Sequence, residues 1–365
     1  MRNVRIILHS AHFKSNVDFI KTYYPHTPHL CMAIKSNAYG HGITEIVHLA
    51  LENNISSFCV ANTEEAVQLR ECGIIGNIYL FSIPDQKDIS TLVEHSIVLM
   101  ISDKNYLHQI YSHAEQQQKI HPVHIQVDTG MGRLGCQPQK VLSLHSYIQK
   151  NPYLRYSGIA THLSSADMDP EFTQTQLQAF HHILSLLKQN QANLQCVHAA
   201  NSAAFFRFPQ SVFDMVRIGI AIYGYPPYSD DIFSILKPVM ELQSYIVYIK
   251  RVPAHTPISY QHTYQTTQIS NIATIAIGYG HGLSRSLSNR GTVLIQGKQY
   301  PIIGNICMDH LMVNLGRDFF KPFTPVSIFG PDKQGISAQD IAKKIGTIPY
   351  EVLCAPSPLI ARKII

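Results

Sequence analysis

The sequence lacks the features that mark a membrane or secreted protein. No stretch approaches the run of about 20 apolar residues that a membrane-spanning helix requires. The opening MRNVRIILHS has no long apolar run followed by small residues, so we expect no signal peptide. The seven cysteines form no C-x-x-C pair, which favours reduced thiols. We therefore expect a cytoplasmic protein with no membrane partner.

Signals for metal and nucleic acid are also missing. The motif H-E-x-x-H does not occur among the 20 histidines, so we expect no bound metal. The formal net charge is +5, but lysine and arginine are scattered, which argues against a nucleic-acid partner. The chain is long enough for two domains. Its 365 residues, 45% of them hydrophobic, are enough for a barrel of about 200–250 residues and a smaller second domain.

Short runs of aliphatic and β-branched residues recur before residue 220. They are CMAIK (31–35), FCVAN (58–62), IYLFS (78–82), IVLMI (97–101), VHIQVD (123–128), SGIAT (157–161), CVHAA (196–200) and MVRIG (215–219). Each has the composition of a strand buried on both faces, and amphipathic stretches such as 63–72 and 172–188 lie between them. This alternation predicts an α/β fold with parallel strands and right-handed crossovers, closed into a TIM-like (β/α)8 barrel. An open doubly wound sheet is the alternative.

The pattern changes near residue 235, where strand-like runs are separated by Gly, Pro, Asn and Asp turns. Such runs occupy 241–251, 272–277, 291–295 and 325–329, and helical periodicity returns only at 337–345. The sequence therefore predicts a mostly β C-terminal domain. We assign residues 9–232 to the barrel and 233–365 to the β-rich domain. Residues 1–8 contain a strand-like segment that we expect to join the β-rich domain.

Reactive groups of such a barrel collect at the C-terminal ends of its strands. The residues found there are Lys35, Arg133, Thr161, His162, Asn201, Ser202, Arg217 and Gly219. A lone lysine ordinarily reaches solvent, but a desolvated lysine in a barrel mouth can form a Schiff base. The glycines of YGHG (39–42) precede a predicted helix, which suits a phosphate group but also an ordinary tight turn.

The sequence contains parts of two nucleotide-binding motifs, but neither motif is complete. Gly130, Gly132 and Gly135 match the dinucleotide fingerprint G-x-G-x-x-G after a predicted strand. That fingerprint needs an acidic residue about 20 positions on to bind the ribose, and no Asp or Glu occurs from 130 to 166. MAIK (32–35) is similar to the kinase lysine motif, but no glycine-rich loop precedes it and neither H-R-D nor D-F-G follows.

A series of motifs resembles those of the alanine racemases, in that family's order and over nearly the whole chain. They are AIKSNAYGHG, DTGMGRLG, THLSSAD, ANSAA, VRIGIAIYG, ISYQHTY, IGYGHGLSR, LSNRG, GNICMDHLMVN and GTIPYEVLC. The resemblance implies a cytoplasmic, homodimeric isomerase that interconverts L- and D-alanine. It also implies the cofactor pyridoxal 5'-phosphate and a role in supplying D-alanine for peptidoglycan.

The resemblance also implies how the cofactor is held. Lys35 should carry it through the side-chain amine. The other cofactor contacts should come from Tyr39, His162, Asn201, Ser202, Arg217, Gly219, Ile220 and Tyr350. Arg217 should face the pyridine nitrogen, and an arginine there donates a hydrogen bond and leaves that nitrogen neutral. A weaker electron sink favours rapid return of the proton over transamination.

Racemisation removes the Cα proton from one face and returns a proton to the other, which two acid/base groups can serve. The resemblance assigns these roles to Lys35 and to Tyr260 of a second subunit. Free Tyr and Lys have pKa values of about 10 and 10.4, so both need tuning by their surroundings. His162, hydrogen-bonded to Tyr260 and near Arg217, completes the catalytic set that the resemblance implies.

The substrate carboxylate should be bound by Arg133 and the backbone of Met308, with Tyr279 at the entrance. One nearby position departs from the family. Gln126 stands where the family commonly has a lysine that is carbamylated and helps to orient the arginine. Gln126 is neutral but can accept a hydrogen bond from Arg133, so we expect activity that does not depend on bicarbonate.

Other functions are also compatible with a barrel and a cofactor lysine. A barrel-fold pyridoxal-phosphate decarboxylase would need an acidic residue facing the pyridine nitrogen, and Arg217 argues against it. A non-catalytic carrier of the cofactor would need only the barrel, so Tyr260 and Met308 in the β-rich domain argue against that. A racemase of another small amino acid stays open, because the sequence does not fix the preference for alanine over serine.

Overall fold

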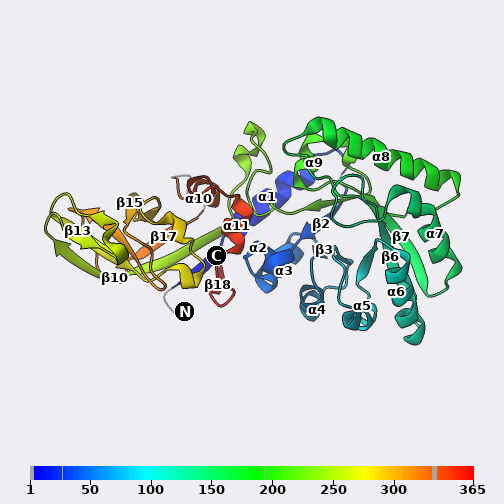
Figure 1. The fold of residues 1–365 in the computed structure, drawn as a ribbon, viewed down its shortest axis with the longest axis horizontal. Coiled ribbons are helices and arrows are strands. Elements are labelled where there is room, and N and C mark those ends of the chain that lie inside the picture. The colour runs from blue at the N-terminus through cyan, green and yellow to red at the C-terminus, as the bar shows by residue number, and fades with distance from the viewer. Residues whose placement is uncertain (1–3, 27, 194, 331–334) are drawn as a thin grey trace.

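The fold was determined as a computed structural model that describes residues 4–26, 28–193, 195–330 and 335–365. A barrel and a β-rich domain lie at opposite ends of an elongated molecule (Figure 1). None of the helices that the described residues form is both long and apolar enough to cross a membrane.

Parallel strands close into a single barrel in sequence order. They are β2 (His29–Ala33), β3 (Ser57–Val60), β4 (Ile78–Leu80), β5 (Val98–Ile101), β6 (His121–Gln126), β7 (Leu154–Ala160), β8 (Val197–His198) and β9 (Met215–Ile218). The barrel closes because β9 pairs with β2, with Met215 opposite His29. The predicted (β/α)8 barrel is therefore confirmed, and the open doubly wound sheet is excluded.

Helices surround the barrel and connect its strands (Figure 1). They are α1 (Ser10–Thr22), α2 (Lys35–Tyr39), α3 (Ile43–Glu52), α4 (Thr63–Glu71), α5 (Ile89–Glu94), α6 (Lys104–Gln116), α7 (Val141–Lys150), α8 (Pro170–Gln189) and α9 (Ser202–Arg207). Four of them begin after a side chain that accepts a hydrogen bond from the first turn. These N-caps are Asn62, Asp103, Asp169 and Asn201, and such caps stabilise a helix start by about 1 kcal/mol.

The β-rich domain is built mainly on one eight-stranded sheet, ordered β13-β16-β15-β14-β17-β10-β1-β18. Its strands are β1 (Arg5–Leu8), β10 (Met240–Val252), β13 (Ser270–Ile275), β14 (Thr292–Ile295), β15 (Lys298–Ile303), β16 (Leu311–Gly316), β17 (Pro325–Phe329) and β18 (Ala361–Ile364). A small second sheet pairs β11 (Pro257–Ile258) with β12 (Tyr264–Gln265), and the helices are α10 (Ala338–Ile345) and α11 (Pro349–Cys354). The strand β1 lies between β10 and β18 in this sheet, and residues 1–3 of the segment 1–8 that we expect in this domain lie outside the described residues.

Single turns of 3-10 helix occupy several of the loops. They are η1 (Gln86–Asp88), η2 (Pro138–Lys140), η3 (Pro209–Ser211), η4 (Asp231–Ile235), η5 (Tyr260–His262), η6 (Tyr279–His281) and η7 (Arg285–Leu287).

The two domains share one continuous hydrophobic core, in which barrel residues such as Met32 join sheet residues such as Leu311. The helix α11 of the β-rich domain packs on α2, next to the end of strand β2. Contact is so close that a Cβ on Gly40 would lie 2.0 Å from the carbonyl oxygen of Leu353. Only glycine fits there, at φ +77°. This packing brings α11 to the mouth of the barrel.

Candidate active site

Most of the predicted site residues follow the C-terminal ends of barrel strands. Lys35 comes after β2 and begins α2, and His162 follows β7. Asn201 and Ser202 follow β8, while Arg217 is in β9 and precedes Gly219 and Ile220. Since the strands are parallel, these residues share one end of the barrel.

The turn after Lys35 is left-handed. Ser36, Asn37 and Ala38 have φ of 55°, 53° and 55°, with ψ close to 50° in each, and Tyr39 has φ 52°. Each such non-glycine residue costs about 1–2 kcal/mol, so tertiary contacts must hold the turn. The buried carboxylate of Glu65 supplies them by accepting hydrogen bonds from the backbone N–H of Ser36 at 2.6 Å and of Asn37 at 3.3 Å. A strained backbone that its surroundings hold in place is typical of functional sites.

The same turn carries Tyr39 into the protein next to the end of strand β9. A Cβ on Gly219 would lie 2.5 Å from the Tyr39 hydroxyl, so the close approach depends on glycine. The hydroxyl of Ser202 accepts the Gly219 N–H at 3.0 Å. The ring of Tyr350, from α11, lies 5.8 Å from the ring of Tyr39. Three hydroxyl groups and a glycine backbone therefore form a polar cradle of the kind that suits a phosphate group.

Asn201 has a structural role beside this cradle, because its side chain bonds to two backbone segments. Its Oδ1 accepts the N–H of Ala204 at 3.0 Å as the N-cap of α9, and its amide donates to the carbonyl of Leu163 at 3.1 Å. The side chain thereby connects the segments that follow β7 and β8.

Arg217 is buried, and both terminal nitrogens of its guanidinium have hydrogen-bond partners. It donates to Nδ1 of His198 at 2.7 Å and to Nδ1 of His162 at 3.3 Å. It also donates to the carbonyls of Thr161 and Ala199, at 2.9 and 3.0 Å. Burial lowers the pKa of Arg217, but arginine starts so high that the group stays charged.

This network fixes the state of His162. Burial, followed by the charges of Arg217, Arg133 and Lys35, lowers the pKa of His162 to about 3. The ring is therefore neutral at pH 7. Because its Nδ1 accepts from Arg217, its one proton is on Nε2, which can act as a donor.

A small cavity at the same barrel mouth is lined by Arg133, Gln126 and His162. Its apolar lining residues include Phe81, Met100 and Met131. Gln126 is only 5% exposed, and its side-chain oxygen has no hydrogen-bond partner among the described residues. The expected hydrogen bond from Arg133 is thus not formed. The cavity offers one charged donor and one unpaired acceptor to a small polar ligand.

Tyr260, Met308 and Tyr279 lie on the β-rich domain, with 69%, 56% and 44% of their surfaces exposed. The Cys307–Met308 backbone accepts N–H groups from Tyr279 and Gly280, and Asn305 donates to the carbonyl of Tyr260 at 2.8 Å. Tyr260 lines an open hollow with Cys307 that has no residue in common with the cavity around Arg133. Within one chain, the structure does not gather these three residues into that cavity.

Three residues of the site escaped the sequence analysis: Glu65, His198 and His124. Glu65 looks like any acidic residue in the first turn of a helix, and nothing local shows that its carboxylate reaches back to residue 36. The two histidines are in the predicted strands VHIQVD and CVHAA. A polar residue within a strand buried on both faces was the signal that could have identified them.

Comparison with known proteins agrees with this geometry. Residues 8–227 match the family model "Alanine racemase, N-terminal domain", and residues 239–364 match "Alanine racemase, C-terminal domain". An alanine racemase of Treponema denticola is 36% identical over 97% of this chain and 96% of its own length. Alanine racemase 2 of Bacillus subtilis is 35% identical over 99% of this chain and 94% of its own.

Solved structures lead to the same family. The alanine racemase of Bacillus anthracis with bound L-Ala-P superposes with a TM-score of 0.92 at 32% identity, over 100% of this chain and 95% of that one. An alanine racemase from D-cycloserine-producing Streptomyces lavendulae gives a TM-score of 0.92 at 29% identity, over 100% and 97% of the two chains. The predicted resemblance is confirmed over both domains, and the chain belongs to the alanine racemase family of isomerases.

Proposed function

We propose that this protein interconverts L- and D-alanine with pyridoxal 5'-phosphate attached to Lys35. The observation that carries the proposal is the convergence of Lys35, the cradle of Tyr39, Ser202 and Tyr350, and the buried Arg217 at one barrel mouth. When bound, the cofactor supplies an electron sink that acidifies the Cα–H bond of an attached amino acid.

The residues present fit this cofactor. The phosphate group would be held by the hydroxyls of Tyr39, Ser202 and Tyr350 and by the backbone at Gly219 and Ile220, where a Cβ on Gly219 would collide with Tyr39. Asn201 would support this cradle as the N-cap of α9. Arg217 would donate to the ring nitrogen, and its contacts with His198 and two carbonyls keep it in place.

Proton transfer at Cα needs a group on each face of the substrate. The side-chain amine of Lys35 would hold or accept a proton on one face. Tyr260 of a second subunit would do so on the other face. His162 supports this arrangement, because its pKa of about 3 leaves it neutral with a proton on Nε2 that can be donated to the phenol oxygen.

Substrate selection would depend on the cavity around Arg133. Its guanidinium would bind the substrate carboxylate together with the backbone of Met308, and Tyr279 would line the entrance. The apolar neighbours Phe81 and Met100 leave little space, which favours a side chain as small as the methyl group of alanine.

The proposal includes a homodimer in the cytoplasm that supplies D-alanine for peptidoglycan. The exposed position of Tyr260 on the β-rich domain supports a role across an interface, since 69% of its surface is uncovered in one chain. The seven cysteines are free thiols throughout the described chain, which suits a reducing compartment.

The proposal is tested with purified protein, its cofactor content and its racemisation of L-alanine. Wild type should carry bound pyridoxal phosphate and form D-alanine until the enantiomers are equal. Lys35→Ala should lose attached cofactor and turnover, whereas the exposed Lys140→Ala should keep both. Racemisation of L-serine at a higher kcat/KM than L-alanine would overturn the substrate assignment, and turnover by Lys35→Ala would overturn the mechanism.

A further inference from the structure

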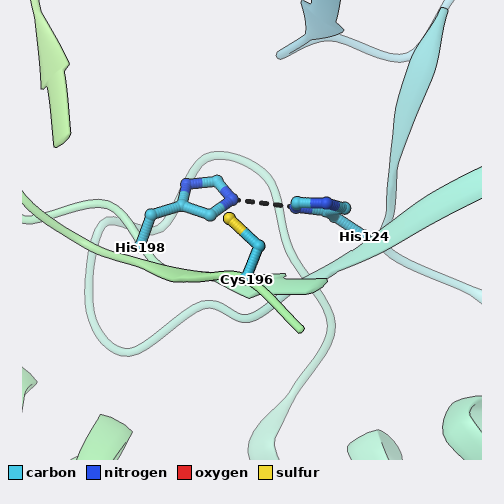
Figure 2. A group of neighbouring side chains, drawn as sticks. All are labelled: His124, Cys196 and His198. Carbon is cyan, nitrogen blue, oxygen red and sulfur yellow. Dashed lines mark hydrogen bonds between the residues drawn. The ribbon is translucent and has the colours of Figure 1, made fainter. Parts of the chain in front are cut away.

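A column of polar side chains runs through the barrel below Arg217. The guanidinium of Arg217 donates to Nδ1 of His198 at 2.7 Å, and Nε2 of His198 lies 2.9 Å from Nδ1 of His124. Figure 2 shows the two imidazoles joined edge to edge with the thiol of Cys196 beside them. Both histidines are at most 1% exposed.

The direction of every hydrogen bond in this column follows from Arg217. A guanidinium only donates, so Nδ1 of His198 must accept and cannot carry a proton. The single proton of neutral His198 is therefore on Nε2, and it is donated to Nδ1 of His124. His124 in turn must carry its own proton on Nε2. One fixed charge thus selects the tautomer of two successive histidines.

Burial and the charge of Arg217 keep the two histidines of the column neutral. They lower the pKa of His124 to about 3 and that of His198 well below its ordinary value. A proton on either ring would place a second positive charge next to Arg217 in a low-dielectric interior. The column is therefore a set of oriented dipoles at pH 7 and carries no charge of its own below Arg217.

The far end of the column reaches a cavity at the N-terminal mouth of the barrel. This cavity of about 240 Å³ is lined by His124 and by polar residues that include Asn77, Ser157 and Gln195. Space for the His124 ring depends on Gly158, because a Cβ there would lie 2.5 Å from its Cε1 and 2.3 Å from the carbonyl oxygen of Cys196.

His124, Cys196 and His198 also have the spacing of a metal site, with one possible ligand atom from each within 4.8 Å of the others. The tautomers argue against metal binding. A metal would need the Nε2 lone pair of His198, but Nε2 carries the proton while Arg217 donates to Nδ1. Burial also raises the pKa of the Cys196 thiol to about 11, and a thiol is a poor ligand.

We propose that His124 is a positioning residue, which accepts the Nε2 proton of His198 and so keeps the Nδ1 of His198 available to anchor Arg217. The effect on the cofactor rests on the proposed function, because Arg217 would face the pyridine nitrogen. The tautomers of His198 and His124 do not depend on the proposed function. An experiment can therefore contradict the positioning role of His124 without contradicting the proposed function, and the reverse.

The direct test is neutron diffraction from deuterated crystals of the holoenzyme. Deuterium on Nε2 of His198 and on Nε2 of His124, with none on either Nδ1, is the expected result. Deuterium on Nδ1 of His198 would overturn the proposal, whatever the enzyme's activity. One equivalent of Zn²⁺ bound tightly by wild type but not by Cys196→Ala would also overturn it.

The functional test compares two substitutions of His124. Asn keeps an acceptor near the position of Nδ1, and Leu removes it. We expect His124→Leu to bind pyridoxal phosphate about tenfold more weakly and to shift the pH titration of the bound cofactor's visible absorption band. His124→Asn should restore both properties toward wild type.

His145→Leu provides the matched control, because it removes a buried histidine from α7 that contacts Tyr156 and not the column. It should leave the absorption titration unchanged. If His124→Leu does not fold, Gly158→Ala displaces the His124 ring by another route and should give the same titration shift. Identical titrations in His124→Leu, Gly158→Ala and wild type would overturn the positioning role.

Discussion

The carboxylate of Glu65 accepts the backbone N–H of Ser36 at 2.6 Å and thereby holds the left-handed turn that follows Lys35. The other carboxylate oxygen accepts the N–H of Ala61 at 3.0 Å, so one side chain ties the end of β2 to the end of β3. Lys35 owes its position in the barrel mouth to a residue thirty positions away that has no part in the chemistry.

Glu65→Gln should destabilise this turn. The amide can keep one oxygen as an acceptor but must direct its NH2 group at a backbone N–H. Loss of a hydrogen bond to a charged group lowers the free energy of unfolding by about 2 kcal/mol, and we expect weaker cofactor binding with it. Urea denaturation and cofactor titration measure the two effects. Glu64→Gln, on the exposed neighbour, is the control, and equal stability of the two variants would contradict the role of Glu65.

Tyr260→Phe should keep the cofactor and lower racemisation by at least about 100-fold, the usual contribution of a positioned acid/base group. The equilibrium between the enantiomers is fixed, so both overall directions must slow together. Exchange of the Cα hydrogen with D2O separates the two faces. One enantiomer should still exchange rapidly through Lys35 without racemising, while the other should exchange slowly.

Tyr248→Phe is a suitable control for that experiment, because Tyr248 is 60% exposed on strand β10 and has no proposed catalytic role. It should racemise like wild type. Equal losses of exchange for L- and D-alanine in Tyr260→Phe would argue against two acid/base groups on opposite faces.

Because residue 126 is glutamine, we expect the racemisation rate not to depend on bicarbonate. Its amide cannot be carbamylated, and its oxygen has no partner among the described residues, so nothing at this position can be gained from carbon dioxide. Rates measured after degassing and after addition of bicarbonate should agree. Gln126→Lys should acquire a dependence on bicarbonate, and a response in wild type would contradict the prediction.

His124 should make the fold sensitive to acid. Its pKa is lowered from the usual 6.5 to about 3, so between these values the unfolded chain binds a proton that the folded chain does not. Stability is present above pH 6.5 and is lost as the pH falls, by about 1.4 kcal/mol per pH unit from this one residue. His124→Asn should remove that part of the slope in denaturant titrations between about pH 4.5 and 6. An unchanged slope, as expected for the exposed His181→Asn, would contradict the assignment.

The sequence predicts the barrel well because strands buried on both faces are nearly continuous apolar runs. The ends of these runs do not always coincide with the ends of the strands. The run CVHAA predicts a strand at 196–200, yet β8 contains only Val197 and His198, because the next residues turn into the site and the cap of α9. Positions that follow strands, such as Lys35 and Ser202, could be predicted because parallel strands all end on the same side.

Contacts between distant segments could not be predicted in this way. Nothing in Ser36-Asn37-Ala38 indicates a left-handed turn, since the conformation depends on Glu65 rather than on glycine. The tautomers of His198 and His124 likewise depend on Arg217, which lies one strand away from His198 and three strands away from His124 in the barrel order. The local sequence pattern predicts the helices and strands. The details of the site depend on hydrogen bonds that form only after those elements have assembled.

The position of β1 has a consequence for how this protein is made and divided. This strand is synthesised before the barrel but pairs with β10 and β18, which are synthesised after it. A nascent chain must therefore keep Arg5–Leu8 unpaired while the whole barrel emerges, with an open strand edge that invites association. Separate expression of the barrel should accordingly begin at residue 9, and separate expression of the β-rich domain requires residues 4–8 to be fused to it or supplied as a peptide.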